Sequence, residues 1–439
     1  MQNFVRNFDF KCQINILIYK YEKYYIFFLV LLFLSSTLKA QFSIDAELRP
    51  RTEQRHGYKQ LPVEDNKAAY FISQRSRLNF NYIQEKYRMG FSIQDVRVWG
   101  DEDLYSSTGV KGNNASLDLY QAWLWLKLGS NSFIKVGRQQ WSYDNQRLLS
   151  GRNWGQHGLT YDGILYGYKK NNFQFDLGLS LNNDSENLFG NEYTPDKMKF
   201  LDFIYLKQNI TNKSYLSFTG ILSGYQKEED SETVYLTATF GPYLKIKSEN
   251  YSLSGNIFYQ MGTKQTGENV NAYMFSLAGD YQIFVPFNVG IGLDWLSGES
   301  DAPGDNSFDI LYGGRHRFYG EMDYFSNLYK STLDLGLRDF FAKFGYEINA
   351  AHSVNLNYHF FSLQKEIDEI GAADFDKLLG DEIDFIYRYK ANIPVDLRIG
   401  FSVFFPSETM EHLQSAAPSD FSYFSYLILT FTPELFLKE

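Results

Sequence analysis

From Phe42 onward, apolar and polar residues alternate with a period of two, and the alternation restarts after turn residues about every 10 to 15 positions. In residues 172–183, the odd positions from Phe173 to Leu181 are all Phe or Leu, while the even positions are small or polar. Residues 287–295 repeat this pattern. Each segment therefore has one apolar face and one small, polar face, which is typical of a β-strand.

The alternation predicts eighteen strands in the chain. We expect them at about residues 42–54, 68–83, 86–99, 116–128, 132–141, 159–169, 172–183, 198–209, 213–226, 232–247, 250–263, 270–284, 287–297, 330–348, 352–365, 381–391, 394–405 and 420–431.

The connections between these strands alternate between short and long. The short ones include 84–85, 129–131, 170–171, 285–286 and 392–393, and the long ones include 55–67, 100–115, 142–158, 184–197, 298–329, 366–380 and 406–419. A soluble sandwich gives no reason for this segregation, whereas outer-membrane barrels have short periplasmic turns and long extracellular loops. We therefore predict an all-β fold, a transmembrane antiparallel β-barrel of about 18 strands.

The composition agrees with a barrel and excludes other classes. The chain has 39 Phe, 34 Tyr and 6 Trp among 439 residues, yet its mean hydropathy is −0.36. That mean is too low for a bundle of membrane helices, each of which needs about 20 consecutive apolar residues. The many aromatic residues also exclude a disordered chain. In a barrel they face lipid or ring the interfaces, and polar residues line the lumen and form the outer loops.

Residues 1–40 have the order of a secretory signal peptide. Basic residues come first, an apolar run from Tyr25 to Leu34 follows, and small residues precede Ala40, after which we expect cleavage. The alternative, a membrane anchor, is disfavoured because the apolar run is too short to span a bilayer. The export signal and the barrel, in residues 41–439, together predict a bacterial outer-membrane location.

The exported part of the chain is acidic and has no cysteine. Residues 1–40 hold five basic and two acidic residues, so the formal net charge of −10 becomes −13 after cleavage, which also removes Cys12. Without disulfides, the stability must come from a large β architecture. Nucleic acid is disfavoured as a partner, because neutralising phosphates needs an excess of basic residues.

Arginine is concentrated in one part of the chain. Of the fifteen arginines after residue 40, ten lie between Arg49 and Arg152, and the next is Arg315. Closing the barrel places the last strands, which carry Arg388 and Arg398, beside the first, so the arginines gather on one wall. Arginine stays charged and binds carboxylates bidentately, so a wall of arginines and aspartates would hold and pass on a chain of carboxylates. The alternative is that the ion pairs only brace the lumen.

The candidate pore-lining residues are arginines of this wall and aspartates near them. In residues 87–99 the apolar parity shifts, and we interpret the shift as a β-bulge near Gln94 that keeps Asp95 and Arg97 in the lumen. Charged lumen residues decide what passes through such a barrel. The full set is Arg49, Arg51, Arg75, Arg77, Asp95, Arg97, Arg138, Asp144, Arg147, Asp162, Arg388 and Arg398.

Six stretches of the chain resemble the alginate export family of outer-membrane proteins. They are GRQQWSYDNQRLLSGRNWGQHGLTYDGI (137–164), QDVRVWGDE (94–102), WLSGE (295–299), LYGGRHRFYGEMDYF (311–325), GDEIDFIYRYKAN (380–392) and IGFSVFFPSETME (399–411). The resemblance implies an eighteen-stranded barrel that lets the anionic polyuronate alginate cross the outer membrane through an electropositive constriction, without ATP or a cofactor. Among the candidates we favour Arg75, Arg77, Arg97, Arg138 and Arg147, because motif and parity coincide. The fourth stretch resembles a branch named for the domain rather than for a tested substrate, so a different acidic glycan remains an alternative.

We expect passive, selective passage of an anionic polysaccharide or oligosaccharide, with export first, through a monomeric barrel in outer-membrane lipid. Periplasmic export partners are part of this expectation. The first alternative is a general or anion-preferring porin for small solutes or oligosaccharide uptake, and the second is an outer-membrane hydrolase. We expect no enzyme, metal or cofactor, because the six histidines lack zinc-ligand spacing and no Gly-x-Ser-x-Gly pattern is present. The acidic segments 226–232 and 368–376 lack the ligand spacing of a calcium loop, so we interpret them as solvated outer loops.

Overall fold

The structure, a computed structural model, describes residues 41–101, 116–183, 185–191, 193–195, 197–228, 231, 233–299, 305–365, 376–416 and 421–438. The predicted signal peptide, residues 1–40, lies outside these residues, as do residues 368–375 of one acidic segment and residues 229, 230 and 232 of the other. Among the described residues, no helix is long and apolar enough to cross a membrane.

In the described part of the chain, nineteen strands make up one sheet. They are β1 (Gln41–His56), β2 (Ala69–Ile83), β3 (Tyr87–Val98), β4 (Leu117–Lys127), β5 (Ser132–Gln139), β6 (Tyr161–Lys170), β7 (Phe173–Leu181), β8 (Met198–Asn209), β9 (Tyr215–Gln226), β10 (Val234–Lys247), β11 (Tyr251–Thr263), β12 (Asn269–Phe284), β13 (Phe287–Leu296), β14 (Leu337–Glu347), β15 (His352–Ser362), β16 (Leu378–Lys390), β17 (Val395–Pro406), β18 (Ser422–Phe431) and β19 (Glu434–Lys438).

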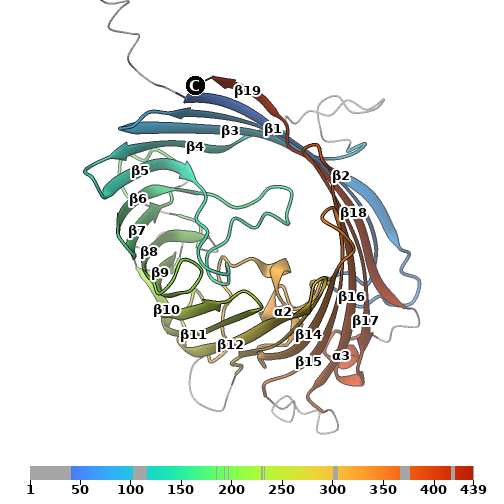
Figure 1. The fold of residues 1–439 in the computed structure, drawn as a ribbon. Coiled ribbons are helices and arrows are strands. Elements are labelled where there is room, and N and C mark those ends of the chain that lie inside the picture. The colour runs from blue at the N-terminus through green and yellow to red at the C-terminus, as the bar shows by residue number, and fades with distance from the viewer. Residues whose placement is uncertain are drawn as a thin grey trace, which may run out of the picture.

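The sheet closes on itself, and every strand pairs antiparallel with its neighbours. β1 pairs with β2 on one side and with β18 on the other. β19 continues past β18 along the start of β1, so these two strands share one position and the wall is eighteen strands around. The predicted antiparallel barrel of eighteen strands is therefore confirmed (Figure 1). Closure leaves no sheet edge whose backbone groups would lack partners in lipid.

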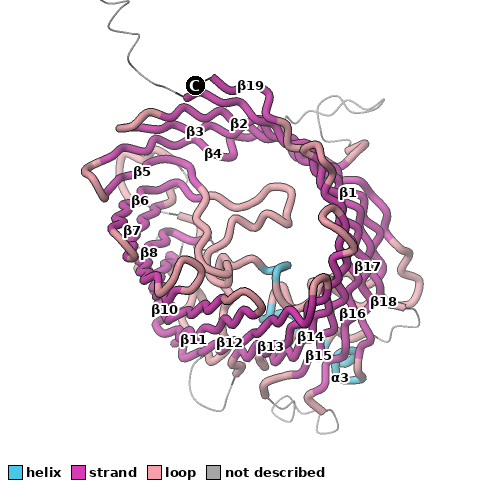
Figure 2. The backbone as a smooth tube through the Cα atoms, viewed as in Figure 1, coloured by secondary structure: helices cyan, strands magenta, loops and turns pink. Residues whose placement is uncertain are grey.

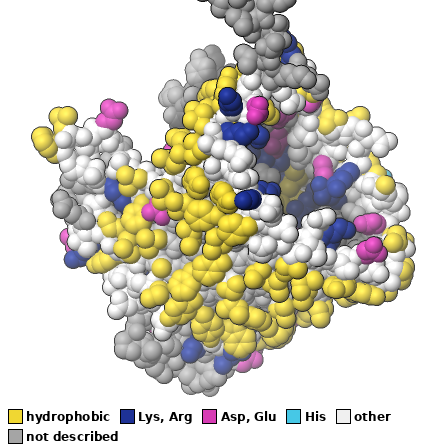
Figure 3. Space-filling view, turned by 60° about the vertical axis from the view of Figure 1, so that its left-hand side comes forward, with side chains coloured by type: hydrophobic (Ala, Val, Ile, Leu, Met, Phe, Trp, Pro, Cys, Tyr) yellow, Lys and Arg dark blue, Asp and Glu magenta, His cyan; other side chains and the backbone are white. Residues whose placement is uncertain are grey.

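The two faces of the wall differ as the alternation predicts. On β9, Leu216 and Leu222 are exposed on the outer face, while Ser217 and Ser223 are buried on the inner face. Figure 3 shows that hydrophobic side chains cover much of the outer surface. Near the short turns this surface includes the exposed tyrosines Tyr87, Tyr251, Tyr281 and Tyr346. Membrane barrels carry such aromatic residues at the lipid interface.

Short turns join the strands at one end and long connections at the other, as expected. Two long connections fold into the barrel (Figures 1 and 2). We call them the β5–β6 loop, residues 140–160, and the β13–β14 loop, residues 297–336, of which 297–299 and 305–336 are described. The second holds η2 (Arg315–Arg317) and α2 (Leu328–Ser331), whereas α3 (Glu408–Leu413) follows β17.

The inner loops pack against the wall through a hydrophobic core inside the barrel. Leu149, Phe308 and Phe325 of the loops and Phe361 and Phe404 of β15 and β17 are almost completely buried. The rings of Phe325 and Phe361 lie 4.5 Å apart. Because burying apolar surface is the main stabilising term in folding, this core holds both loops in the lumen.

The start of β14 differs from the prediction. The sequence places a strand from about residue 330, but β14 begins at Leu337. Leu333, Asp334 and Gly336 have positive φ angles, which interrupt an extended backbone. The apolar Leu335 is buried with the inner loops, so its hydrophobicity reflects the core inside the barrel rather than a strand.

Candidate functional site

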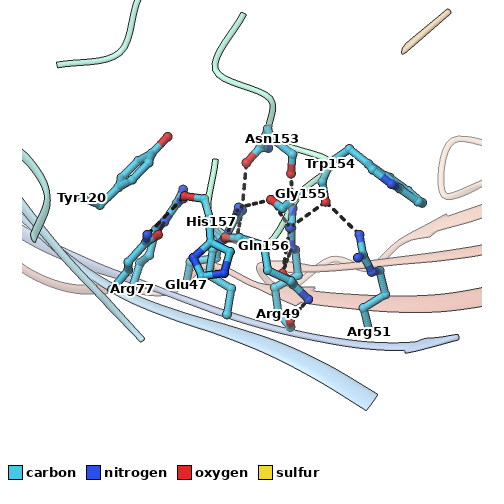
Figure 4. Close-up of polar contacts among 12 residues, drawn as sticks. Glu47, Arg49, Arg51, Arg77, Tyr120, Asn153, Trp154, Gly155, Gln156 and His157 are labelled. Carbon is cyan, nitrogen blue, oxygen red and sulfur yellow. Dashed lines mark hydrogen bonds and ion pairs between the residues drawn. The ribbon is translucent and has the colours of Figure 1, made fainter. Parts of the chain in front are cut away.

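Arginines on the inner face of β1 hold the tip of the β5–β6 loop against the wall (Figure 4). Arg49 donates hydrogen bonds to the backbone oxygens of residues 153–155, the shortest at 2.6 Å, and to the side chain of Gln156 at 2.8 Å. Arg51 donates to the backbone oxygen of Trp154 at 2.8 Å. The loop tip therefore turns its carbonyl groups toward this strand.

Two arginines of β2 continue this contact. Arg75 pairs with Glu47 of β1 and donates to the backbone oxygens of Gly155 and Gln156 at 3.4 and 3.3 Å. Arg77 donates to the backbone oxygen of His157 at 3.2 Å. We call the four side chains, Arg49, Arg51, Arg75 and Arg77, the arginine clamp.

The arginine clamp is covered by the loop that it holds. Arg75 is 1% exposed and Arg49 is 6% exposed. A guanidinium has five N–H donors, and the loop carbonyls accept bonds that water would otherwise accept. Glu47 and Glu53 offset part of the charge. These four predicted pore-lining residues do lie on the inner face, but the expectation that they face the open lumen is wrong, because the loop lies over them.

The two inner loops pack on each other through their backbones. Leu149 and Tyr312 form a parallel β-bridge, and Gly314 donates its N–H to the backbone oxygen of Gln146 at 2.8 Å. A Cβ atom at Gly313 would collide with the backbone oxygen of Arg147, so only glycine fits there. The loops therefore form one unit.

Two predicted residues of the β5–β6 loop tie this unit to the wall. Arg147 donates to both carboxylate oxygens of Asp294 on β13, at 2.5 and 2.6 Å. Asp144 accepts hydrogen bonds from Tyr205 of β8 at 2.7 Å and from Ser217 of β9 at 2.8 Å. Both residues lie inside the barrel, and both position the loop.

Trp154 and His316 join the tips of the two loops. Their rings stack with centroids 3.4 Å apart and an angle of 11°. Nδ1 of His316 lies 2.9 Å from Asp323, and Nε2 lies 3.2 Å from Glu321, which also accepts a bond from Arg398 of β17 at 2.7 Å. Burial alone would lower the pKa of His316, but the two carboxylates raise it to about 9. His316 is therefore a cation at neutral pH, lying on the Trp154 ring.

The His316 junction is expected to loosen at alkaline pH. Because its pKa is raised from 6.5 to about 9, the protonated ring stabilises the junction fully below about pH 6.5 and stops doing so as the pH rises through about 9. A shift of this size corresponds to about 3 kcal/mol. Open-channel current noise should therefore increase above pH 9 in planar bilayers. The His316→Gln variant should be noisy at pH 7 already and change less with pH; equal pH dependence in both proteins would contradict this role.

Asp95 and Arg97 lie on the outer face of the barrel, so their predicted place in the lumen is wrong. They pair with residues of β2 that alternate with the inward-facing Arg75. The register between β3 and β4 does shift, but the extra residue is Tyr120 on β4, so β3 keeps its parity. Asp95 and Arg97 form an ion pair with each other at 2.7 Å.

Arg138 and Asp162 also lie on the outer face, contrary to the prediction. They face each other in register across β5 and β6 and form an ion pair at 2.8 Å. The inner face of β5 instead carries Gln139, which is completely buried. The remaining predicted pair lies inside: Arg398 bonds to Glu321, and Arg388 pairs with Asp396 near the short turns.

Five lysines on the inner face were not predicted. They lie toward the short-turn ends of five different strands, and we call them the lumen lysines: Lys135 of β5, Lys169 of β6, Lys207 of β8, Lys245 of β10 and Lys343 of β14. Lys169 and Lys207 pair in register with the same residue, Gln174 of β7, so they lie two strands apart, about 10 Å.

Aromatic rings lie beside the ammonium groups of three of the lumen lysines. The ammonium groups of Lys135, Lys207 and Lys343 lie 4.1, 3.6 and 4.6 Å from the ring centroids of Trp123, Tyr215 and Phe341. Within the described part of the chain, none of the five forms an ion pair. A cation on a ring is held in place but keeps its charge, so it can still attract an anion.

Strained backbone is concentrated in the two inner loops. Asp144, Gln146 and Arg152 of the first loop and Leu311 and Tyr319 of the second have positive φ angles. Such conformations are unfavourable for residues other than glycine and often mark functional segments. The loops that narrow the barrel are therefore held in a specific shape by the surrounding contacts.

A closed barrel with an apolar outer face and a charged lumen narrowed by inner loops defines an outer-membrane channel. Residues 40–423 match the model of the alginate export family, so the chain belongs to that family and lies in the outer membrane. A comparison with curated proteins gave no match.

Solved structures of outer-membrane channels have the same fold. OprD from Pseudomonas aeruginosa is 12% identical, with a TM-score of 0.58 over 90% of this chain and 94% of that chain. OccK9 (OpdG) from the same organism is also 12% identical, with a TM-score of 0.58 over 90% of this chain and 98% of that one. OpdK with vanillate has 12% identity and a TM-score of 0.57, covering 90% and 99%. The family description, alginate export, names transport rather than catalysis.

Proposed function

We propose that this barrel passes an anionic polysaccharide or oligosaccharide, such as a polyuronate, passively across the outer membrane, with export as the main direction. The observation that carries the proposal is the set of lumen lysines, which present ammonium groups without an ion-pair partner among the described residues on the inner face of the barrel. Carboxylates on successive sugar units would exchange from one lysine to the next. The family description, alginate export, supports a polyuronate.

The arginine clamp and the inner loops have a different part in this mechanism. The clamp fixes the β5–β6 loop, and this loop with the β13–β14 loop narrows the lumen to a path for an extended chain. The width of the lumen then selects the shape of the molecule that passes, and the lumen lysines select its charge. Pore width and lining charge are the two determinants of passage through a pore. One chain closes the barrel, so a monomer suffices. Direction would come from periplasmic export partners or a concentration gradient, because the barrel has no energy source.

Release of a charged oligosaccharide from liposomes tests the proposal. Liposomes that contain the protein are loaded with a labelled oligouronate or with a neutral oligoglucoside of equal length. We expect the oligouronate to leave about tenfold faster than the neutral chain. Attraction between an anion and a positively charged pore can raise the rate of entry by at least this factor. Equal rates, or faster release of the neutral chain, would contradict it.

The second candidate function is an anion-preferring porin for small solutes. The lumen lysines would also suit small carboxylates, and OpdK, whose structure contains vanillate, has the same fold. The liposome experiment separates the two functions: a porin for small solutes would release an organic acid but retain the oligouronate. The hydrolase alternative has no support from the family or the solved structures, all of which are channels.

A further inference from the structure

A cavity opens inside the barrel at the end opposite the lumen lysines. It has a volume of about 400 Å³ and lies against the long-connection ends of β9 to β12. The β13–β14 loop closes its other side with Asp309, Leu311 and Asp334. This volume lies in the range of small-molecule pockets and is large enough for a sugar ring.

The cavity lining is made mostly of groups that hydrogen-bond to hydroxyls. Ser223 and Tyr225 of β9, Thr237 of β10 and Gln265 and Thr266 of the turn after β11 contribute side-chain hydroxyl and amide groups. Tyr225 also presents an aromatic ring, which can pack against the apolar face of a sugar. Such a lining suits a polyhydroxylated ligand and disfavours an apolar one.

Carboxylates outnumber cations around this cavity. Glu268, Asp305, Asp309 and Asp334 line it, and the single lysine in the lining, Lys264, pairs with Asp305. Burial and the charge of Asp305 raise the pKa of Asp334 to about 6. The surplus negative charge would repel a uronate.

The acids of the cavity are dispersed rather than gathered around one point. Within the described residues, no group of three or more His, Cys, Asp or Glu side chains could hold a metal ion. Asp309 already accepts the N–H of Leu311 at Oδ1, and the half-buried carboxylate of Asp334 lies beside the hydroxyl of Ser307. An ionised carboxylate only accepts hydrogen bonds, and sugar hydroxyls are suitable donors.

We propose that this cavity is a saccharide subsite that holds a sugar ring without an acidic group. The hydroxyl and amide side chains of β9, β10 and the turn after β11 bind the ring from the wall, and Asp309 and Asp334 accept its hydroxyl hydrogens from the β13–β14 loop. The subsite goes beyond the proposed function: the lumen lysines select acidic sugars at one end, and this cavity selects non-acidic sugars at the other.

Saturation-transfer NMR on the purified full-length protein in detergent tests the subsite with glucose, glucosamine and glucuronate as probes. We expect glucosamine to displace bound glucose and glucuronate to displace it at least fivefold more weakly. Displacement of glucose reports binding at this cavity and not binding of glucuronate at the lumen lysines. In the double variant Asp309→Asn, Asp334→Asn, glucose binding should weaken at least threefold, and the preference against glucuronate should decrease because two of the four repelling carboxylates are removed.

A matched variant and a second readout keep the test decisive. Asp280→Asn changes an inner-face acid near the short-turn end of β12, outside the cavity, and should leave all three affinities unchanged. Unchanged bilayer conductance shows that the double variant is folded. The proposal is overturned if glucose fails to bind, if glucuronate displaces glucose from the unmodified protein as well as glucosamine does, or if the double variant keeps the original preference. None of these outcomes bears on the lumen lysines.

Discussion

Replacing Arg49 and Arg75 together with alanine is expected to raise the single-channel conductance in planar bilayers about twofold or more. The two side chains donate most of the hydrogen bonds that hold residues 153–156 against β1 and β2. Hydrogen bonds from a charged group contribute about 1.5–3 kcal/mol each. The loss of several such bonds should therefore remove enough stabilisation to release the loop tip. The tip should leave the wall while the barrel stays folded, because the loop core is untouched.

Two further variants distinguish the effect of the geometry of the arginine clamp from the effect of its positive charge. The double variant Arg49→Lys, Arg75→Lys keeps both positive charges but loses the planar fork of donors, so it should also raise the conductance. Arg138→Ala removes an arginine from the outer face, where it pairs with Asp162, and should leave the conductance unchanged. If the lysine variant conducts as the unmodified protein does, charge rather than the geometry of the clamp holds the loop.

Replacing Lys169, Lys207 and Lys245 with glutamine is expected to abolish the preference for anions, and replacing them with glutamate should reverse it. The three lie on the inner face of alternate strands, β6, β8 and β10, and form no ion pair within the described chain, so their charge acts directly on ions in the lumen. In a narrow lumen with walls of low dielectric constant, a few such charges dominate the selectivity. Reversal potentials in a salt gradient measure the change.

A triple variant with the same change of net charge serves as the control. Lys86, Lys170 and Lys213 are exposed in or beside the short turns at the same end of the barrel. Replacing them with glutamine should shift the reversal potential little, because exposed charges in water are screened within about 10 Å. An equal shift in both triple variants would mean that net charge near the opening, not the lumen lysines, sets the selectivity.

The fold could be predicted from the sequence because lipid and water impose opposite demands on the two faces of every strand. The alternation from Phe173 to Leu181 needs no knowledge of other strands to be interpreted. The same rule fails where the inner loops fill the lumen. On β8, Leu201, Phe203 and Tyr205 face inward and are apolar, because they pack on the β5–β6 loop.

The candidate site was harder to predict for the same reason. Arg49 and Arg75 were placed on the correct face, but only the structure shows the loop that covers them. Arg138 was placed on the wrong face because a strand with charged residues near its outer end has no clear parity. Lys207 was missed because it shares its face with the aromatic Tyr205, so its strand lacks a purely polar side.

The reversal potential of the unmodified protein tests most directly the central claim that the lumen lysines select anions. Single channels are recorded in a planar bilayer with a tenfold gradient of potassium chloride. We expect a reversal potential displaced from zero toward the equilibrium potential of chloride, and a larger displacement at low ionic strength, where charges are screened less. A reversal potential of zero, or one on the potassium side, would contradict it.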